Sequence, residues 1–465
     1  MAKIVVAGGG ICGMAGALML ARDGHDVIVV DRDDAPVPGD CESAWAWERR
    51  SVAQFRLGHV MQPGGHRIMK TELPDVVTRL HGAGGLATRL LTLPPGDAPR
   101  DDDHRFDTVT GRRTAIEWAL ATGLATEPRV EVRRGAVIAG LVTGASVLDG
   151  VPHVAGLQLT SGEELLADLV VDATGRRSPT LDWLAAISAR APIETTEDIG
   201  FTYTGRFFRS SDGSLPEEHM PGLLTACGSV SLLTLPSDNG TWAATLYTAS
   251  NDSVMRAARD PKVFERVWRA FPAHAHWVEG EPISDVTTMS GAVDRTRRFV
   301  VDDAPVVTGM LSIADAHACT NPSLGRGMTL GLMHTVLMRD AVREHLAEPL
   351  ALALAFDAAT AASLEPWHAA TRAFDRGRMA EIQANITGEA IEPGAEAAIG
   401  AALAGAAQLD GDAARWLGEI VTCLALPAGV FSRPGVFERV LELAGDLPPA
   451  APYGPDRKQL LELMS

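Results

Sequence analysis

The hydrophobic pattern at the start of the chain predicts a strand, a glycine turn, a helix and a second strand in close succession. Residues 4–7 are apolar and rich in β-branched side chains, and the glycine-rich stretch 8–13 follows them directly. The small, apolar stretch 14–21 has the composition of a buried helix, and 27–30 indicates a second buried strand, which ends at Asp31. A strand–turn–helix–strand unit of about 30 residues that ends in an acid has the layout of a dinucleotide-binding fold.

The glycines and the acid of this unit have different expected roles. Gly8 permits a tight turn, Gly10 lets the backbone approach a pyrophosphate, and Gly13 lets the helix pack closely on the sheet. The amino end of the helix offers free N–H groups and a positive dipole to the anion. Asp31 is placed to accept hydrogen bonds from a ribose diol, and we group its neighbour Arg32 with the nucleotide-binding residues.

Glycines, and acids next to glycines, recur in the next part of the chain. They do not form a second complete nucleotide-binding unit. A helix-like pattern covers 64–81, so we interpret the glycines at 82–85 as the end of that helix and a loop. No second Rossmann unit is therefore expected for a nicotinamide cofactor. The acidic run 101–103 is expected to be a solvated loop. A strand at 169–171 leads into Asp-Ala-Thr-Gly at 172–175.

Residues 201–207 and 241–247 predict longer strands that belong to an inserted sheet. Phe201, Tyr203 and Phe207 would share one face of the first strand, because alternate side chains of a strand point the same way. Packing within the sheet is the simpler interpretation of this face. The alternative is the wall of a substrate pocket, for which Phe201 and Tyr203 are our candidates.

The chain then returns to the first domain through an apolar stretch that ends at Asp315. Further glycines follow, and a helix is expected to begin at Gly327 and Met328 and to run to about residue 340. Beyond it the chain is rich in alanine and leucine at helical spacing, with prolines between the segments. We favour core packing for this tail over a dimer surface or a membrane-lying surface, because acidic residues interrupt it and no basic apolar face stands out.

Composition excludes several classes of function. The 465 residues contain 41 Lys and Arg against 59 Asp and Glu, a formal charge of −18, so nucleic acid is not an expected partner. The five cysteines are scattered without metal-ligand spacing, so we expect no metal site and a reducing compartment. No apolar run reaches about 18 residues, so no membrane span is expected. We therefore expect a cytoplasmic protein.

Three separated elements together resemble the flavoprotein monooxygenases of the para-hydroxybenzoate hydroxylase fold. They are the first glycine turn with Asp31, the turn at 172–175, and Asp315 followed by Pro322, Gly325, Gly327 and Met328. The similarity covers roughly residues 3–340. The superfamily also includes epoxidases, flavin-dependent halogenases and geranylgeranyl reductases.

The resemblance implies an α/β composite fold: a Rossmann-like FAD-binding domain, an inserted, mainly antiparallel β-sheet domain for the substrate, and a helical C-terminal region. We place the FAD-binding domain at 1–180 and 290–345, the sheet domain at 181–289, and the helical region at 346–465.

Shorter motifs extend the resemblance within one bacterial monooxygenase and epoxidase branch. Ser51-Val52-Ala53-Gln54 followed by His59 is similar to the branch's Gly-Val-Pro-Gln and histidine, with Ser51 and Ala53 departing from it. Residues 113–117 are similar to its Arg-x-x-Leu-Glu helix start, and Ala314-Asp315-Ala316 stands where the family has Gly-Asp-Ala.

The resemblance assigns roles at the cofactor. Arg50 and Arg113 would neutralise the pyrophosphate, and Asp315 would accept hydrogen bonds from the ribityl chain. Gly325 and Gly327 would bring N–H groups and a helix dipole to the flavin N1–C2=O edge. Arg326 would lie beside the isoalloxazine or, with equal weight, in solvent.

The activity that this resemblance implies is FAD-dependent monooxygenation. Electrons from NAD(P)H and O2 would form a flavin C4a-hydroperoxide, which hydroxylates or epoxidises a small hydrophobic organic substrate of secondary metabolism. His59 is the candidate catalytic base or substrate contact, although a structural role is the commoner one for a single histidine. Whether the chain is a homodimer, or takes its electrons from a separate reductase, stays open.

Three alternatives remain beside the monooxygenase. The first is a flavin-dependent reductase or dehydrogenase of the same fold. A halogenase is disfavoured because Trp45-Ala46-Trp47 continues with Glu48-Arg49-Arg50 and not as the halogenase signature Trp-x-Trp-x-Ile-Pro. The third is a non-catalytic protein that binds FAD for stability.

Overall fold

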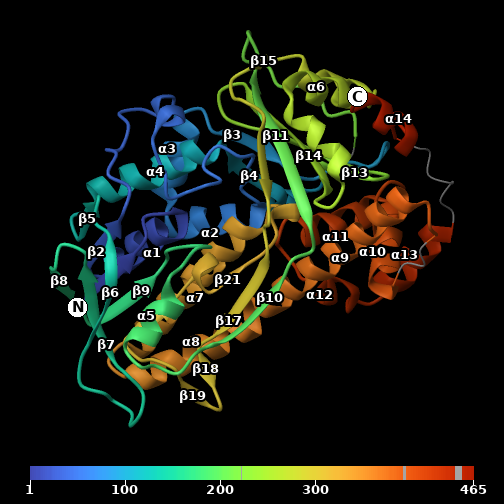
Figure 1. The fold of residues 1–465 in the computed structure, drawn as a ribbon. Coiled ribbons are helices and arrows are strands. Elements are labelled where there is room, and N and C mark those ends of the chain that lie inside the picture. The colour runs from blue at the N-terminus through green and yellow to red at the C-terminus, as the bar shows by residue number, and fades with distance from the viewer. Residues whose placement is uncertain (221, 391–393, 446–452) are drawn as a thin grey trace.

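A five-stranded parallel sheet forms the centre of the first domain (Figure 1). The computed structural model describes residues 1–220, 222–390, 394–445 and 453–465. The strand order β20–β9–β1–β2–β5 places the N-terminal strand in the middle of the sheet. The three central strands β9, β1 and β2 are largely apolar, as expected where both faces are covered, whereas the edge strand β5 is partly polar. The five strands are β1 (Lys3–Ala7), β2 (Asp26–Asp31), β5 (Val130–Arg134), β9 (Leu169–Asp172) and β20 (Met310–Ser312).

Helices cover one face of this sheet and a smaller sheet covers the other. On the first face, helix α1 (Ile11–Arg22) lies between α4 (Arg113–Thr126) and α7 (Gly327–His345), and it is buried along nearly its whole length. On the second face, apolar side chains of the parallel strands pack on an antiparallel sheet and on one short helix. These elements are β6 (Ile138–Thr143), β7 (Val154–Leu159), β8 (Glu164–Leu166) and α5 (Thr180–Ala186).

The inserted sheet is antiparallel, in the order β12–β13–β14–β11–β15, with β16 also paired to β11. The two long strands that the sequence predicts are confirmed as β11 and β14, which pair over their full length. Its strands are β11 (Phe201–Arg209), β12 (Leu224–Cys227), β13 (Val230–Pro236), β14 (Thr241–Ala249), β15 (Glu281–Pro282) and β16 (Thr287–Ser290). Three helical segments cover one face: η3 (Ser253–Arg259), α6 (Pro261–Arg269) and η4 (Ala275–Val278).

A three-stranded sheet joins the inserted sheet to the first domain. Its strands are β10 (Ile193–Glu197), β17 (Asp294–Arg298) and β21 (Ala318–Cys319), in the order β10–β17–β21. A further two-stranded ribbon lies beside it, made of β18 (Val300–Val301) and β19 (Ala304–Pro305). The domain boundaries drawn from the sequence stay predictions.

The C-terminal part is helical, and it contacts both domains. Helix α8 packs on α7, the long helix α9 reaches strand β14, and α14 packs on α6 (Figure 1). Between them, helices α10 to α13 enclose a small apolar core of their own. The helices are α8 (Pro349–Ser363), α9 (Glu365–Thr387), α10 (Ala395–Ala406), α11 (Gly411–Val421), α12 (Pro427–Phe431), α13 (Val436–Gly445) and α14 (Arg457–Leu463). Within the described ranges, no helix is long and apolar enough to cross a membrane.

Two local expectations are wrong. The helix predicted over 64–81 is two helices that meet at Leu73, because the ring of Pro74 disfavours a helical conformation at the residue before it. The acidic run 101–103 is not wholly solvated, since the buried Asp103 carboxylate accepts hydrogen bonds at 2.7 and 2.8 Å from Arg415. The elements here are α2 (Pro63–Glu72), α3 (Pro74–Gly82), η1 (Ser43–Ala46), η2 (Asp101–Phe106), β3 (Leu86–Arg89) and β4 (Asp107–Thr110).

Candidate functional site

Predicted site residues from distant parts of the chain meet at one edge of the parallel sheet. Gly8 follows β1, Asp31 ends β2, and Asp315 lies in the short helix η5 (Ala314–Ala316) just after β20. Because the strands are parallel, their carboxyl ends lie at the same edge, which is where this class of sheet binds ligands. Cys12 in the first turn of α1 confirms the proximity. Burial raises the pKa of its thiol to about 12, and the charges of Asp315 and Arg113 both act on it.

The glycines of the first turn divide into those that the fold requires and one that leaves space. Gly8 has φ of 107°, and a Cβ there would lie 2.5 Å from the carbonyl oxygen of Ala173. A Cβ on Gly13 would lie 2.0 Å from the carbonyl oxygen of Gly8. Around Gly10, no atom of the described residues lies within 4 Å of an added Cβ. Gly8 and Gly13 therefore permit the turn itself, whereas Gly10 presents bare backbone to open space.

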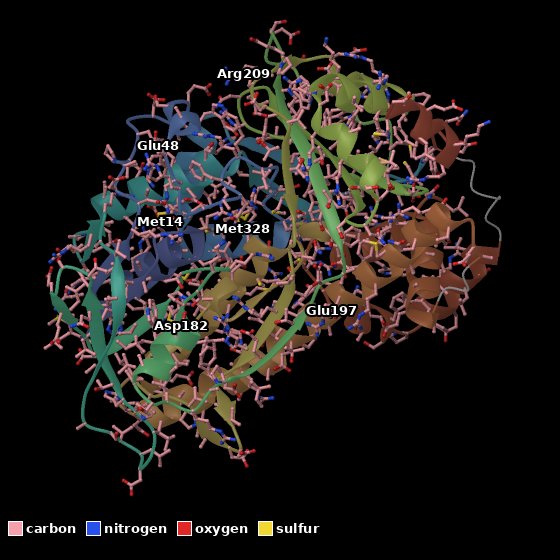
Figure 2. All side chains as sticks on the ribbon, in the orientation of Figure 1. Met14, Glu48, Asp182, Glu197, Arg209 and Met328 are labelled. Atoms are coloured by element: carbon pink, nitrogen blue, oxygen red, sulfur yellow. The ribbon has the colours of Figure 1, made fainter. Side chains whose placement is uncertain are left out.

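The arginine at this turn is Arg49, which the sequence reasoning missed. Its buried guanidinium donates to the Gly9 carbonyl oxygen at 2.7 Å and lies 3.0 Å from the Asp31 carboxylate. It also donates to Asp33 at 3.2 Å. The predicted Arg50 is instead exposed, and among the described residues its one ion-pair partner is Glu48, which Figure 2 labels toward the rim of the molecule. The structure thus places Arg49, and not Arg50, at the glycine turn.

Arg32 also points away from the turn. Its side chain is exposed, and its one hydrogen bond within the described residues is a long one, 3.5 Å, to the carbonyl oxygen of Ser51. Ser51 itself contributes through its backbone, since its N–H donates to the Asp33 carboxylate at 3.0 Å. Ser51 therefore packs against the end of β2.

Arg113 and His59, predicted separately, are in contact. Arg113 donates through Nε to the fully buried Glu117 at 2.7 Å and through Nη1 to His59 Nε2 at 3.2 Å. His59 Nδ1 lies 2.9 Å from the carbonyl oxygen of Leu57. A guanidinium only donates and a carbonyl only accepts, so the His59 proton is on Nδ1 and its Nε2 lone pair is used by Arg113. Burial and the Arg113 charge lower the pKa of His59 to about 3, so the ring is neutral near pH 7.

Several buried polar atoms beside the turn have no hydrogen-bond partner within the described parts of the chain. They are Oδ2 of Asp31, Nη1 of Arg49, Oε2 of Glu117 and Nη1 of Arg134. Burial raises the pKa of Asp31 in spite of the nearby Arg49 charge. Asp31 Oδ2 lies 3.0 Å from Arg49 Nη2, so the unused hydrogen-bonding capacity of this cluster rests mainly on Nη1 of Arg49 and Oε2 of Glu117, and buried groups of this kind are costly to leave without a partner.

The second glycine pair stands at the amino end of α7. Gly325 adopts a left-handed φ of 62° after the short helix η6 (Pro322–Leu324), and an added Cβ on Gly327 would meet open space among the described residues. Gln62 donates to the Leu324 carbonyl oxygen at 3.2 Å, which ties this loop to the beginning of α2. Met328 follows on the first turn of α7, near the centre of the view in Figure 2, and packs against the main core.

Asp315 lies between the two glycine turns, and its carboxylate faces a small cavity. The cavity has a volume of only about 10 Å³ and is lined by Asp315, Gly327 and residues of α7 and α9. Ala314, which replaces the family's glycine, adopts a left-handed φ of 50°. The turn therefore keeps its shape with an alanine, at some cost in backbone strain.

The Arg326 side chain does not lie in solvent. Its buried guanidinium donates to Thr371 Oγ1 at 3.2 Å and to the Ile420 carbonyl oxygen at 2.9 Å. Its central carbon is 5.4 Å from the ring centre of Trp367, in cation–π range. This side chain links the beginning of α7 to the C-terminal helices, so the expectation of a solvated arginine is wrong.

The inner face of the inserted sheet meets the loop before α7. The Tyr203 hydroxyl donates to the Asn321 side chain, and the Tyr247 hydroxyl donates to the Ser323 carbonyl oxygen at 3.1 Å. The two tyrosine rings lie 4.5 Å apart, and Phe201 packs 6.1 Å from Tyr203. Phe201 and Tyr203 therefore lie where the sheet, the loop and helix α9 converge.

An acid from α9 completes this corner, which we call the tyrosine corner: Phe201, Tyr203, Tyr247, Asp294, Asn321, Ser323 and Asp375. Asp375 is fully buried, and burial is the main cause that raises the pKa of its carboxyl to about 8. Neither oxygen of Asp375 has a hydrogen bond of acceptable distance and angle within the described residues. The same is true of Oδ2 of Asp294 and of Nδ2 of Asn321. Polar atoms are thus grouped here without partners, as they are at the first turn.

The functional candidates that sequence reasoning missed are Arg49, Asn321 and Asp375. Arg49 was adjacent to the chosen Arg50, but nothing in an irregular loop says which of two consecutive arginines turns inward. Asn321 directly precedes the chosen Pro322, so its motif was found and its side chain overlooked. Asp375 had no local signal, since it is one acid among many on a long helix.

Comparison with known proteins agrees with this geometry. No family model matches the chain. Protein Rv3254 of Mycobacterium tuberculosis is 26% identical over 372 residues, which cover 73% of this chain and 72% of that protein. PqsL of Pseudomonas aeruginosa, a probable FAD-dependent monooxygenase, superposes with a TM-score of 0.59 at 18% identity over 82% of this chain and 99% of its own. The flavin-dependent brominase Bmp2 superposes with a TM-score of 0.61 at 14% identity over 95% and 98%. The fold is therefore that of the flavin-dependent monooxygenases and halogenases, as the sequence motifs predicted.

Proposed function

We propose that this chain is an FAD-dependent monooxygenase that hydroxylates or epoxidises a hydrophobic organic metabolite. The observation that carries the proposal is the shared edge of the parallel sheet. There, Gly10 presents bare backbone beside buried polar atoms that lack hydrogen-bond partners, and Gly327 presents bare backbone beside Asp315. Solved structures with this fold include flavin-dependent oxygenating and halogenating enzymes, which supports the assignment to oxidoreductases.

The residues at this edge fit a molecule with a pyrophosphate at one end and a flavin at the other. Gly10 and the amino end of α1 would receive the pyrophosphate, with Arg49 in place of Arg50 as its buried cation. Asp31 would accept from the adenosine ribose through its carboxylate, and Asp315 would accept from the ribityl hydroxyls.

The flavin ring would lie against the loop 322–327. The N–H groups around Gly325 and Gly327, and the dipole of α7, would face its N1–C2=O edge. A helix amino end stabilises negative charge by roughly 0.3–2 kcal/mol. When bound, FAD reduced by NAD(P)H would activate O2 and supply one oxygen atom to the substrate.

The protein's own contribution is orientation, proton handling and exclusion of water. His59 and Glu117 hold the Arg113 guanidinium from two sides, so His59 acts here as a positioning residue rather than as a base. The low pKa of His59 and its occupied Nε2 both argue against proton abstraction by this ring.

The tyrosine corner is the better candidate for contact with the substrate. Its aromatic rings offer an apolar wall, and Asp375 and Asn321 offer a few polar atoms, the combination typical of small-molecule sites. A substrate with a phenol or enol would place its hydroxyl near Asp375. Because the pKa of Asp375 is raised to about 8, this carboxyl can exchange a proton with such a group near neutral pH.

Oxygen incorporation tests the proposal. The FAD-loaded protein would be supplied with NADH or NADPH, ¹⁸O2, and a panel of aromatic, polyketide and isoprenoid compounds. We expect at least one compound to accelerate NAD(P)H oxidation and to gain one ¹⁸O atom. A product that is reduced and carries no new oxygen would assign the chain to the reductases. A brominated or chlorinated product in halide buffer would assign it to the halogenases.

A further inference from the structure

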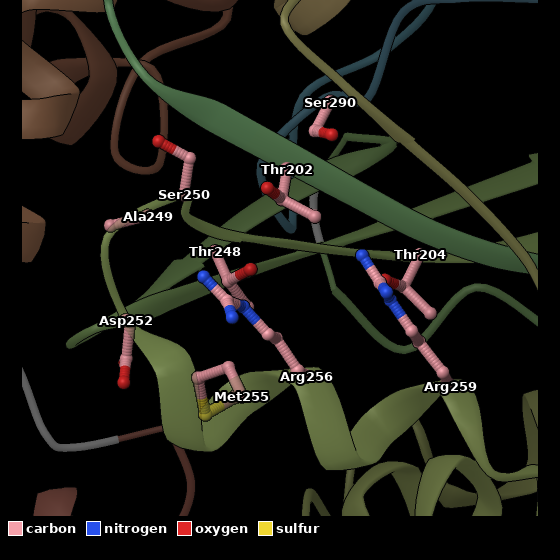
Figure 3. A pocket seen from close by; sticks show the side chains of 10 residues that line it. All are labelled: Thr202, Thr204, Thr248, Ala249, Ser250, Asp252, Met255, Arg256, Arg259 and Ser290. Carbon is pink, nitrogen blue, oxygen red and sulfur yellow. The ribbon is translucent and has the colours of Figure 1, made fainter.

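A cleft on the outer face of the inserted sheet lies apart from the sites described above. It has a volume of about 270 Å³ and opens between strands β11 and β14 and the helical segment η3 (Figure 3). Thr202 and Thr204 line it from β11, whereas Tyr203 between them belongs to the tyrosine corner on the opposite face. The thickness of the sheet therefore separates this cleft from the proposed flavin site.

Two arginines of η3 point their guanidinium groups over the cleft. Figure 3 shows Arg256 reaching toward Thr248 and Arg259 reaching toward Thr204. The two are three residues apart, the spacing that places side chains on the same side of a 3₁₀-helix. Both are exposed, and neither has an ion pair or a side-chain hydrogen bond to any residue whose position is described.

Unpaired arginines are unusual in this chain, where acids outnumber bases by 59 to 41. The one carboxylate that lines the cleft is Asp252, and Arg457 already binds it through hydrogen bonds of 2.6 and 3.0 Å. The charge of Asp252 is therefore compensated from outside the cleft. Two positive charges are left facing the space.

The rest of the lining consists largely of hydroxyl groups. Five of the ten lining residues are threonine or serine: Thr202, Thr204, Thr248, Ser250 and Ser290. Hydroxyls donate hydrogen bonds to oxyanions, and arginine forks match the oxygen geometry of phosphate. The cleft is also several times larger than a single phosphate ion, so it has room for an organic group attached to that phosphate.

We propose that this cleft binds the phosphate group of a small phosphorylated molecule, with Arg256 and Arg259 as the two cations. The hydroxyls of Thr202 and Thr248 would donate to the remaining phosphate oxygens. Phosphate fits better than carboxylate, because a tetrahedral dianion can accept from both arginine forks and from the hydroxyls of the sheet at once. The site is independent of the proposed flavin chemistry.

Calorimetric titration of the full-length protein tests the site. The probes are inorganic phosphate and ribose 5-phosphate, with ribose and acetate as comparisons, all at one ionic strength. We expect saturable binding of both phosphate probes and none of ribose. The Arg256→Gln/Arg259→Gln double variant should bind at least about tenfold more weakly. Thr202→Val, which removes one hydroxyl and keeps the shape, should lower the affinity by a smaller factor.

A matched control is Arg67→Gln. Arg67 is also exposed and, within the described residues, has no ion pair, but it lies on α2 in the first domain. This variant should titrate like the wild type, and all variants should melt at the wild-type temperature. Three results would overturn the proposal: no saturable binding of either phosphate, equal binding by the double variant, or acetate binding as tightly as phosphate.

Discussion

Two buried polar regions of this protein handle charge in opposite ways. At the first glycine turn, the three carboxylates of Asp31, Asp33 and Glu117 lie against three guanidinium groups, those of Arg49, Arg113 and Arg134. In the tyrosine corner, Asp294 and Asp375 lie among hydroxyls and an amide, and the nearby Arg326 is bonded to the C-terminal helices. The first region is balanced and suits a permanent, anionic ligand. In the second, no arginine is hydrogen-bonded to either acid within the described residues, and burial raises the pKa of both carboxyls, to about 8 for Asp375, which suits a changing substrate.

The largest expected effect separates folding from cofactor binding within the first region. In Gly13→Ala the new Cβ would lie 2.0 Å from a backbone oxygen, so we expect the loss of several kcal/mol of stability and little folded protein. In Gly10→Ala the same atom meets open space, so the chain should fold normally yet bind FAD at least about tenfold more weakly. Thermal melts and flavin content check both. If Gly10→Ala retains wild-type FAD affinity, the pyrophosphate does not lie there.

Removing a cation from the balanced region comes next. Arg49→Met leaves three buried carboxylates with less compensation, so we expect a loss of about 3–5 kcal/mol in the free energy of unfolding. Arg50→Met is the matched control, and it should unfold like the wild type because Arg50 is exposed. Denaturant unfolding measures both. Equal stability of the two variants would mean that Arg49 does not balance these acids.

In the tyrosine corner, removing a charged group should stabilise the protein at high pH, whereas removing Arg49 destabilises it. The pKa of Asp375 is about 8 in the folded chain and near 4 in the unfolded chain. Its contribution to stability is therefore complete below pH 4 and is lost as the pH rises toward 8, by about 1.4 kcal/mol per pH unit. Asp375→Asn removes this slope, so the variant should be more stable than the wild type at pH 8 and about equal to it at pH 4.

Unfolding curves at several pH values, with Asp357→Asn on the neighbouring helix α8 as control, would measure this difference. Asp357 pairs with Arg298 at 3.1 Å, so its substitution should not produce a gain at pH 8. A wild-type stability that does not fall between pH 5 and 8 relative to Asp375→Asn would show that Asp375 is ionised and paired.

The smallest effect concerns the turn between the two regions. Ala314→Gly should raise the free energy of unfolding by about 0.5–1 kcal/mol, because glycine adopts the left-handed φ of 50° without strain. Ala316→Gly, two residues later in a buried position with ordinary φ, should instead destabilise the chain. If Ala314→Gly also destabilises, the turn holds alanine without strain.

The sequence predicted the first region better than the second, for a physical reason. The glycine turn is one continuous unit of strand, turn, helix and acid, so its pattern is local. Asp375 joins the tyrosine corner through the packing of a helix that is distant in the sequence. The partner of the buried Asp103 is Arg415, which lies 312 positions later in the chain. Such contacts leave no periodic trace in the chain. The break at Leu73 could have been predicted from the sequence, because proline disfavours a helical conformation at the residue before it. We nevertheless expected one helix over 64–81.

The central claim is that a single FAD binds along the carboxyl edge of the parallel sheet, with its pyrophosphate at Gly10 and its flavin at Gly327. Fluorescence titration of deflavinated protein with FAD tests it most directly, in the wild type and in Gly10→Val and Gly327→Val. We predict one FAD bound per wild-type chain, and weakened binding in both variants with unchanged melting of the flavin-free chains. Wild-type protein that folds and binds no FAD, or variants that both bind it with wild-type affinity, would contradict the account.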